Sequence, residues 1–405
     1  MTLRTGSGIN EPARPSNLRV QNSRTLLGLV RDHEPCSKAD LARLSGLSAP
    51  TVAAAVAELS ERGLLEVVGE GPSSGGRPPE LLRFRPEHRF VAAADIGGTR
   101  LRMMVADLNG TPVAECKCVI APDAKRPEDI CVLLREQLLS ACASAGIPFD
   151  KILHLTVGAP GITDVRSGIV LSAPNLTAWS NVPLRQMLEE LCGLQVTVEN
   201  DVNLAAIGEH WRGAAAEVDN FILIAIGTGI GSGIFVNGRL YHGAQWSAGE
   251  MGYMPVHGQP RQTPNVNSPG QLESTIGGAG IERMWREKLK LSGRAEDQAL
   301  MKLRANRILD RFDEAQDPDA IAILTQAAMI LADTIVTTML ILDPSLVVLG
   351  GGVGAHSSLQ REVEKFLQLV HFPRPAVRTS TLDTHAQLYG AIALALDACH
   401  AELVC

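Results

Sequence analysis

The sequence predicts an α/β protein: a winged helix-turn-helix at residues 16–88, after a flexible N-terminus at residues 1–15, and a larger α/β domain at residues 89–405. Three observations predict this architecture. Two short helical patterns around a glycine turn precede a strand, turn and strand; apolar strand patterns twice end in similar glycine-rich turns; and a third glycine run follows another apolar strand. At 405 residues, 45% hydrophobic, the chain is long enough for two or three buried cores.

Composition narrows the class of protein. The net charge of -7 is uneven, because residues 1–92 sum to +2 and the remainder to -9, which permits nucleic-acid contact at the front. The eight cysteines are scattered, as expected for reduced thiols rather than for a disulfide framework. No run approaches the roughly 18 uninterrupted apolar residues of a membrane helix, and the N-terminus lacks an apolar signal core. We therefore expect a cytoplasmic protein with no membrane partner.

The front module is predicted to bind double-stranded DNA. A helical pattern at residues 17–32 is followed by "CSKADLARLSGLSAPTVAAAVAELSERGLL", in which Ser37 and Asp40 form a capping-box pattern and Gly46 supplies a left-handed helix end. Two helices around such a turn form a helix-turn-helix, whose second helix enters the major groove. The residues expected to contact DNA from that helix are Ser48, Ala49, Pro50 and Thr51.

A predicted wing follows the two helices. The strand patterns "LLEVVGEG" and "PELLRF" flank "PSSGGRPP", whose tip holds Gly76, Arg77 and Pro78. An arginine in a slim glycine and proline frame suits a narrow minor groove, and the alternative is a plain hairpin turn with a solvated arginine. The second helix is rich in alanine, which contacts thymine methyl groups but makes no bidentate hydrogen bonds. We therefore expect the wing and DNA shape to supply much of the specificity.

The larger domain begins with a pattern that occurs twice. "FVAAADIGGTRLRMMVADLNG" and "FILIAIGTGIGSGIFVNGRL" both read as strand, glycine turn and strand, both end in an Asn-Gly hairpin signal, and Gly227 follows Gly97 by 130 positions. Such turns let backbone N–H groups cradle phosphate oxygens, although neither is a Walker A loop or a full dinucleotide-binding pattern. The third run, Gly350–Gly352, ends an apolar strand, where ligands bind in open α/β sheets. The residues expected at the two phosphate-binding turns are Asp95, Gly97, Gly98, Thr99, Gly227, Thr228 and Gly229.

With these residues assembled, the chain resembles the ROK family of repressors and sugar kinases, and within it the winged-helix regulators of the NagC/XylR type. The resemblance covers about residues 16–401 and rests on "GGRPP", "DIGGTR", "GAPGITD", "SAPNLTAW", "ENDVNLAAIGE", "GTGIGSG", "AGEMGY" and "LGGGV" in this order. It implies an actin-like fold of two lobes, about residues 89–200 plus the C-terminal helix and about residues 201–385, with a cleft between them. We expect a homodimer or homotetramer.

The resemblance also implies which side chains meet the hydroxyls of a sugar. They are Asn175, Asn200, Asp201, Glu250 and Glu273. Amides and carboxylates around a polyol make physical sense, because each can satisfy neighbouring hydroxyls that lose water on binding. The alternative for each of these residues is a capped turn or a solvated loop.

One family feature is missing from the sequence. Members commonly hold a structural zinc through a histidine and three cysteines, and here those places are Tyr253, Pro264, Val266 and Gln271. None of these side chains can ligate zinc as an imidazole or a thiolate does, so we expect no metal site and no required cofactor. The loop before Glu273 must then be held by packing or be mobile until a ligand binds.

Together these features predict a sugar-responsive DNA-binding transcriptional regulator rather than an enzyme, a repressor whose operator binding is modulated by a sugar or sugar phosphate in the cleft. The alternative is a sugar kinase, with ATP and Mg²⁺ at the glycine turns and Asp201 as the general base. Every residue type that it needs is present, but the lost zinc run and the DNA-binding module favour the regulator. A third, weaker interpretation is a constitutive DNA-binding protein with an inactive cleft.

Overall fold

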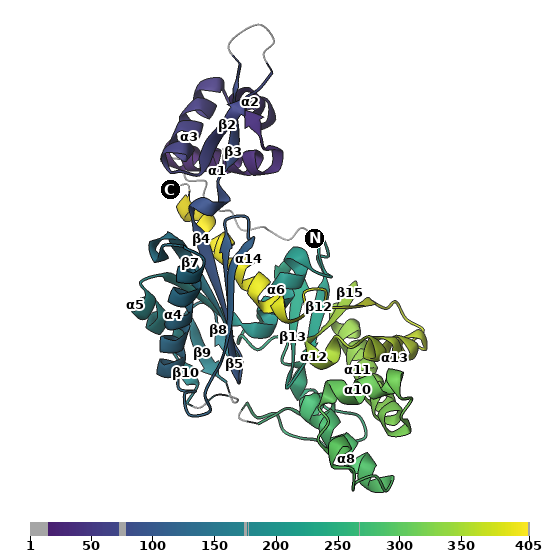
Figure 1. Cartoon of the computed structure of the whole chain (residues 1–405). Helices are drawn as coiled ribbons and strands as arrows, with labels where there is room; N and C mark the ends of the chain where they lie inside the picture. Colours follow the sequence, from purple (N-terminus) through teal and green to yellow (C-terminus); the bar gives the residue numbers. More distant parts are fainter. Residues whose placement is uncertain (1–14, 73–77, 174–175, 177, 267, 404–405) are drawn as a thin grey trace. The chain divides into compact units, whose positions relative to one another are not determined.

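Figure 1 shows the computed structural model of the chain, which describes residues 15–72, 78–173, 176, 178–266 and 268–403. The predicted flexible N-terminus therefore lies almost entirely outside the described residues. The chain divides into two compact units, which are described separately below. The smaller unit holds residues 1–90, 106–111 and 396–405, and the larger unit holds residues 91–105 and 112–395.

The smaller unit is a winged helix-turn-helix, as predicted. Its elements are α1 (Pro15–His33), β1 (Cys36–Ser37), α2 (Lys38–Ser45), α3 (Ala49–Glu61), β2 (Leu65–Glu70), β3 (Glu80–Phe84) and a 3₁₀ turn, η1 (Pro86–His88). The three strands form one antiparallel sheet in the order β1-β3-β2. Residues 73–77, which hold the predicted wing tip, lie outside the described residues, and Pro78 lies just beyond them.

The caps that the sequence predicts define the ends of α2 and α3. The Ser37 hydroxyl accepts a hydrogen bond from the Asp40 N–H at 3.2 Å, and the Asp40 carboxylate accepts one from the Ser37 N–H at 3.1 Å, which is the reciprocal capping box. Gly46 ends α2 with a φ of 69°. Ser48 caps α3 by accepting from the Thr51 N–H at 3.4 Å. Because both helices are capped at the turn between them, their relative orientation is well defined.

A compact apolar core holds the three helices together. Leu26 and Val30 of α1, Leu41 of α2, and Val52 and Leu59 of α3 are fully buried. They come from faces spaced three or four residues apart, as an amphipathic helix requires. The smaller unit therefore has a core of its own.

The larger unit contains two five-stranded sheets with the same strand order, which confirms the internal duplication. The first sheet reads β6-β5-β4-β7-β11 and the second β14-β13-β12-β15-β16. The strands of the first are β4 (Phe90–Ile96), β5 (Arg100–Asp107), β6 (Pro112–Val119), β7 (Ile152–Ala159) and β11 (Gln195–Asn200). The strands of the second are β12 (Phe221–Ile226), β13 (Ile230–Val236), β14 (Arg239–Leu240), β15 (Leu346–Gly350) and β16 (Ala376–Thr379). We call the two halves the first and the second lobe.

Further elements surround these sheets. A small antiparallel sheet of the first lobe contains β8 (Ile162–Asp164), β9 (Ile169–Ser172) and β10 (Ser180–Val182). The helices are α4 (Pro127–Ser144), α5 (Leu184–Cys192), α6 (Asp201–Arg212), α7 (Gln271–Ile276), α8 (Gly278–Leu291), α9 (Gln298–Met301), α10 (Ala305–Glu314), α11 (Pro318–Leu342), α12 (Gly351–Gly354), α13 (Ser357–Gln368) and α14 (Ala386–Leu403). Three 3₁₀ turns are η2 (Phe149–Lys151), η3 (Met251–Tyr253) and η4 (Asp383–His385).

The long helix α11 is the centre of the second lobe's core. Its 25 residues are apolar enough to cross a membrane by length and composition, but its most apolar window is 56% buried inside the unit. Leu324, Leu331 and Ile335 pack in one cluster with the fully buried Trp285 of α8. The indole N–H of Trp285 donates to the Leu300 carbonyl at 2.7 Å, so the largest buried ring keeps its one polar atom paired. The burial explains the hydropathy of α11 as that of a core helix.

Helices α6 and α14 pack closely against each other within the larger unit. A Cβ at Gly390 of α14 would lie 1.8 Å from the Leu204 carbonyl oxygen of α6, and one at Gly208 would lie 2.1 Å from the Ala386 carbonyl oxygen. Only glycine allows two helix backbones to approach this closely. Since α6 begins at Asp201, this contact fixes the helix that carries the candidate base.

Candidate functional site

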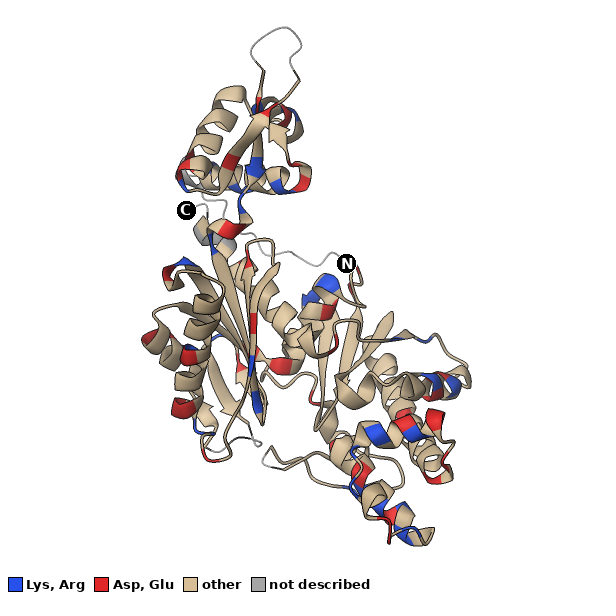
Figure 2. Cartoon of the chain, in the orientation of Figure 1, with Lys and Arg blue, Asp and Glu red and all other residues tan. Residues whose placement is uncertain are grey.

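The N-terminal end of α3 presents the residues predicted to contact DNA. Ser48, Ala49 and Pro50 are exposed and Thr51 is half-buried, with its hydroxyl 2.8 Å from the Ser48 hydroxyl. The helix carries no Lys or Arg, and its charged residues, Glu58 and Glu61, lie toward its other end (Figure 2). This surface therefore offers hydroxyls, methyl groups and the helix N-terminus to DNA rather than cationic side chains.

The pair Asn200 and Asp201 lies where β11 passes into α6. Asn200 is the N-cap of the helix: its Oδ1 accepts from the Asn203 N–H at 2.9 Å, and its Nδ2 donates to the Gly161 carbonyl at 2.8 Å. Both ends of this amide therefore already have backbone partners. The Asp201 carboxylate accepts from the Val202 N–H at 2.9 Å and from its own backbone N–H, and no side-chain donor to it is found among the described residues. Asn200 caps the helix and keeps one further N–H and one further lone pair on its amide, and both Asn200 and Asp201 stay predictions as effector-binding residues.

The electrostatics of Asp201 suit a group that binds or accepts a proton. Burial, together with the nearby charges of Asp95 and Glu250, raises the pKa of the Asp201 carboxyl from 3.8 to about 7. Burial and the charge of Glu273 raise the pKa of Glu250 to about 6. The structure thus brings together four of the carboxylates that the sequence singled out. Such a cluster is expensive without a ligand, because burial and like charges both disfavour ionisation.

Glu273 has a second task in this cluster. Its Oε2 accepts a hydrogen bond at 2.9 Å from the Ile230 N–H, at the end of the glycine turn Gly227–Gly229. Tyr253 stands in the place of the family's histidine and lies near both glutamates. Burial is the main cause that raises the pKa of its phenol, and the charges of Glu250 and Glu273 add to it. Glu273 therefore links the predicted phosphate turn to the carboxylate cluster. The fifth predicted effector residue, Asn175, lies outside the described residues.

Hydrogen bonds of Gln271 hold the loop that is expected to lack zinc. Its side-chain amide donates from Nε2 to the Pro260 carbonyl at 3.1 Å and to Gln259 Oε1 at 3.4 Å. The Thr275 hydroxyl reaches the same Gln259 oxygen at 3.3 Å. No group of three or more His, Cys, Asp or Glu side chains that could hold a metal occurs among the described residues. These hydrogen bonds tie residues 259 and 260 of the loop to α7, and whether the remainder of the loop moves when a ligand binds stays open.

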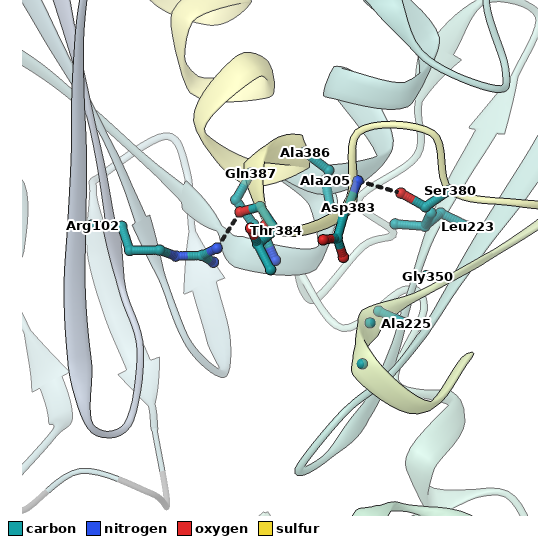
Figure 3. Close-up of a pocket in the computed structure, with 12 residues that line it drawn as sticks. Arg102, Ala205, Leu223, Ala225, Gly350, Ser380, Asp383, Thr384, Ala386 and Gln387 are labelled. Atoms are coloured by element: carbon teal, nitrogen blue, oxygen red, sulfur yellow. Dashed lines mark hydrogen bonds between the residues drawn. The ribbon is translucent and has the colours of Figure 1, made fainter. Parts of the chain in front are cut away.

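An arginine that sequence reasoning did not single out occupies the first glycine turn. Arg102 of β5 donates from Nε at 3.0 Å and from Nη2 at 2.7 Å to one oxygen of the buried Asp95, and from Nη1 to the Thr384 carbonyl (Figure 3). Asp95 was predicted as part of the phosphate-binding turn. In this structure its carboxylate is paired with the guanidinium of Arg102, and its part in phosphate binding stays a prediction.

Arg102 also lines a pocket of about 190 Å³ (Figure 3). Its wall includes the glycine run Gly350–Gly352, Ser380, Asp383 and Gln387. The Gln387 Oε1 atom is buried without a hydrogen-bond partner within the described residues. The third glycine run therefore does line a pocket, as its place at a strand end predicted. Only the alternation of polar residues along "TRLRMM" hinted at an inward arginine.

Comparison with known proteins identifies the class to which this fold and site belong. Residues 91–398 match the model of the ROK family, and residues 19–74 match that of the MarR family. The chain belongs to the ROK family, and its winged helix-turn-helix sets it with the transcriptional regulators of that family.

Individual relatives include both regulators and kinases. The xylose repressor of Caldicellulosiruptor bescii is 26% identical over 394 residues, which cover 94% of this chain and 96% of that protein. The xylose repressor of Bacillus subtilis is 30% identical over 236 residues, 58% of this chain and 60% of that protein. The glucokinase of Halalkalibacterium halodurans is 29% identical over 316 residues, 75% of this chain and 93% of that enzyme.

Among solved structures, a ROK family transcriptional regulator described as a homologue of the E. coli MLC protein matches with a TM-score of 0.78. It is 22% identical, and the match covers 96% of this chain and 98% of that chain. At this identity the match shows the fold. It confirms a winged helix-turn-helix followed by an actin-like domain of two lobes.

Proposed function

We propose that the protein is a sugar-responsive repressor that binds an operator through the smaller unit and a sugar or sugar phosphate through the larger one. The observation that carries this proposal is the combination, in one chain, of a capped helix-turn-helix and a carboxylate cluster in which Asp201 accepts hydrogen bonds from backbone N–H groups alone. Hydroxyl groups of a sugar are the donors that such a cluster lacks. The xylose repressors similar to this chain suggest a pentose or hexose as the first ligands to test.

The mechanism that we propose couples the two units through differential binding. Two copies of α3 contact two half-sites of a palindrome-like operator, which requires two copies of the chain. A sugar in the cleft shifts the operator equilibrium only by as much as its affinity differs between the two states, about 1 to 3 kcal/mol in typical cases. Arg77 of the wing, outside the described residues, is proposed to enter the minor groove beside Gly76 and Pro78.

Selection of genomic fragments by the purified protein at physiological salt tests the DNA-binding part. The expected result is enrichment of a few palindrome-containing fragments, with affinity roughly tenfold lower for Thr51→Ala and Arg77→Ala. Ser60→Ala, an exposed position at the other end of α3, is the matched control and should bind as the wild type does. Equal binding to all fragments, unchanged in the variants, would contradict an operator-specific regulator.

Thermal shift with D-xylose, D-glucose and their phosphates tests the effector part. A bound ligand raises the midpoint by mass action, by an amount set by the ratio of its concentration to its dissociation constant. Asp201→Ala should abolish the shift. Operator binding that no sugar changes, together with no shift, would favour the constitutive DNA-binding protein.

We further propose that the protein is not a sugar kinase, and the Asp95–Arg102 pair supports this. Phosphoryl transfer needs Mg²⁺ to neutralise the nucleotide's phosphates, and Mg²⁺ is commonly held through one or two carboxylates. Here the carboxylate at the first glycine turn already has a cation, Arg102, whose third nitrogen reaches Thr384. A metal and nucleotide must displace that guanidinium. The pKa of Asp201 itself, about 7, suits a general base as well as a ligand reader.

Coupled-enzyme detection of ADP with D-glucose and D-xylose tests this second proposal. We expect no ADP above background from the wild type. Steady ADP production with one sugar, abolished by Asp201→Ala, would establish the kinase. Arg102→Ala distinguishes sugar binding from nucleotide binding. The variant should keep the thermal shift that the sugar causes. Because it frees the Asp95 carboxylate, it is also the variant in which a thermal shift by Mg-ATP would first become measurable.

The remaining proposals concern assembly, location and cofactors. We propose a homodimer, with contact between copies at exposed apolar side chains near the C-terminal end of α11 and in the segment that follows α13. These side chains are Leu340 (61% exposed), Ile341 (75%), Leu369 (73%) and Phe372 (55%). Exposed apolar patches of this kind mark interaction surfaces. Light scattering should give a dimer that Ile341→Glu converts to a monomer, and an unchanged assembly would place the contact elsewhere.

We further propose that the protein is cytoplasmic and requires no metal or cofactor.

A further inference from the structure

The loop between β14 and η3, residues 241–250, belongs to the second lobe by its backbone but contacts the first lobe by its side chains. Its two ends are tied to β13, because the Tyr241 N–H donates to the Ile234 carbonyl at 2.8 Å and the Ser232 N–H donates to the Gly249 carbonyl at 2.9 Å. Glu250, a predicted effector residue, follows directly. The loop is therefore anchored in the lobe that supplies Glu250 and Glu273.

Two ring side chains of this loop reach across to the first lobe. His242 Nε2 lies 2.7 Å from Oε2 of the buried Glu199, at the end of β11. The Trp246 ring lies under the guanidinium of Arg166, which is 5.3 Å from the ring centroid and sits in the turn between β8 and β9. The two rings meet edge to face, with centroids 5.6 Å apart. These four side chains form a continuous chain of contacts that begins and ends in the first lobe.

Trp246 adopts a backbone conformation that a bulky residue rarely takes. Its φ is 61°, in the left-handed region that favours glycine. Such a conformation is costly and persists only when surrounding contacts over-determine it, and it is enriched at ligand sites and switches. The contacts that hold it are those to Arg166 and His242. The strain and the interlobe contacts therefore belong to one arrangement.

The same contacts reach the recognition residues of the first lobe. Glu199 Oε1 accepts from the Asn200 N–H at 2.8 Å and from Asn203 Nδ2 at 2.9 Å, while its Oε2 meets His242. Gly161, just before β8, accepts from Asn200 Nδ2. Any displacement of the loop relative to the first lobe thus pulls on the N-cap that positions Asp201.

We propose that Arg166, Trp246, His242 and Glu199 form an interlobe clasp, which sets the position of the loop at residues 241–250 relative to Asp201. Through this clasp, binding of a ligand at the effector site is coupled to movement of the two lobes. All four are positioning residues. This inference rests on the proposed function for the role of the effector, but the clasp itself has consequences that can be measured without any ligand.

Hydrogen–deuterium exchange of the full-length protein without ligand tests the clasp directly. Trp246→Gly removes the ring and is compatible with the left-handed backbone, so the variant is expected to fold. Loss of the clasp should speed exchange by roughly two- to thirtyfold in the segments 162–172 and 199–204, because contacts of this strength hold them. Trp211→Phe is the matched control, since Trp211 also lies under an arginine, Arg212, with its guanidinium carbon 3.9 Å from the ring centroid, in the same unit.

The proposal is overturned if exchange in Trp246→Gly rises only within residues 241–250, or matches that of Trp211→Phe, since Trp246 would then be local packing alone. Arg166→Gln should reproduce the effect and Arg166→Lys should largely restore the wild-type rates. With D-xylose or D-glucose as the probe, whichever shifts the wild-type midpoint, the clasp variants should lose most of the sugar-induced change in operator affinity while still binding the operator. An undiminished sugar effect would overturn the coupling; absence of any sugar or operator binding in the wild type would count against the proposed function and leave the exchange result to decide the clasp.

Discussion

Replacement of Asp201 by Asn should make the larger unit more stable at neutral pH. The isosteric amide keeps an oxygen to accept the Val202 N–H, as the carboxylate does at 2.9 Å, but carries no charge. The wild-type carboxyl has its pKa raised from 3.8 to about 7 by burial and by the charges of Asp95 and Glu250. Between pH 3.8 and about pH 7, the Asp201 carboxyl has lost its proton in the unfolded chain but keeps it in the folded protein. The wild type therefore loses stability as pH rises through this range.

The magnitude follows from the size of the shift. One pH unit of pKa difference corresponds to 1.36 kcal/mol, so the shift of about three units sets an upper limit of about 4 kcal/mol above pH 8. At pH 5, which lies about one unit above the pKa of the unfolded chain, the wild type has lost only about 1.5 kcal/mol of this stability. The advantage of Asp201→Asn over the wild type should therefore grow by about 2 to 3 kcal/mol between pH 5 and pH 8.

Urea unfolding followed by tryptophan fluorescence measures this difference in the right part of the protein. The larger unit contains all four tryptophans, Trp179, Trp211, Trp246 and Trp285. Unfolding of the smaller unit therefore contributes no tryptophan fluorescence change of its own. Histidines titrate in the same range, but they do so in both proteins and cancel in the difference. Asp123→Asn, at an exposed loop position, is the control. Parallel pH profiles of wild type and Asp201→Asn would refute the reasoning, because Asp201 would then be ionised in the folded state at the same pH as in the unfolded state.

Further substitutions test other parts of the structure. Ser37→Ala removes the capping box of α2 and should destabilise the smaller unit by about 1 kcal/mol, seen as faster amide exchange in residues 38–45; unchanged exchange would argue against the cap. Gly390→Ala places a Cβ 1.8 Å from the Leu204 carbonyl oxygen and should lower the urea midpoint of the larger unit by the equivalent of about 2 kcal/mol or more. Gly208→Ala, whose Cβ would lie 2.1 Å from the Ala386 carbonyl oxygen on the other side of the same contact, should have a similar effect, and an unchanged midpoint in both variants would contradict the close packing of α6 and α14. Gln271→Ala should make residues 254–270 sensitive to protease without changing the fold, and resistance equal to the wild type would show that packing alone holds the loop.

Local sequence signals predicted the elements and their ends. The capping box at Ser37, the left-handed Gly46 and the hairpin at Asn237 and Gly238, with φ of 52° and 70°, depend on residues within a few positions of one another. The duplication was visible because both copies keep the same turn chemistry. Each of these features is decided by backbone conformation, which short stretches of sequence encode.

The contacts that give the site its character connect distant parts of the chain. Arg102 contacts a carbonyl 282 positions away, and Trp246, with a φ of 61°, contacts the side chains of Arg166 and His242. Neither propensity nor spacing reports such partners. The sequence assigns Asn200 to the ligand, and the fold adds that each end of its amide has a backbone partner, Asn203 or Gly161, and keeps a second hydrogen-bonding position. A residue type identifies what a side chain can do, and only the fold shows which of its atoms are already used.

The choice between a base and a ligand reader at Asp201 therefore depends on the residues around it more than on Asp201 itself. A carboxyl with a pKa near 7 can accept a proton from a sugar hydroxyl or accept its hydrogen bond. Transfer needs a phosphoryl donor aligned with that hydroxyl, and misplacement by about 1 Å can cost a hundredfold in rate. Arg102 forms an ion pair with Asp95 at the turn where a metal and phosphates would have to be held, while Glu250 has no such ion pair among the described residues. Under the proposed function, Asp201 and Glu250 are the carboxylates that accept hydrogen bonds from the sugar's hydroxyl groups, and the pairing of Asp95 with Arg102 is the reason that we expect no phosphoryl transfer.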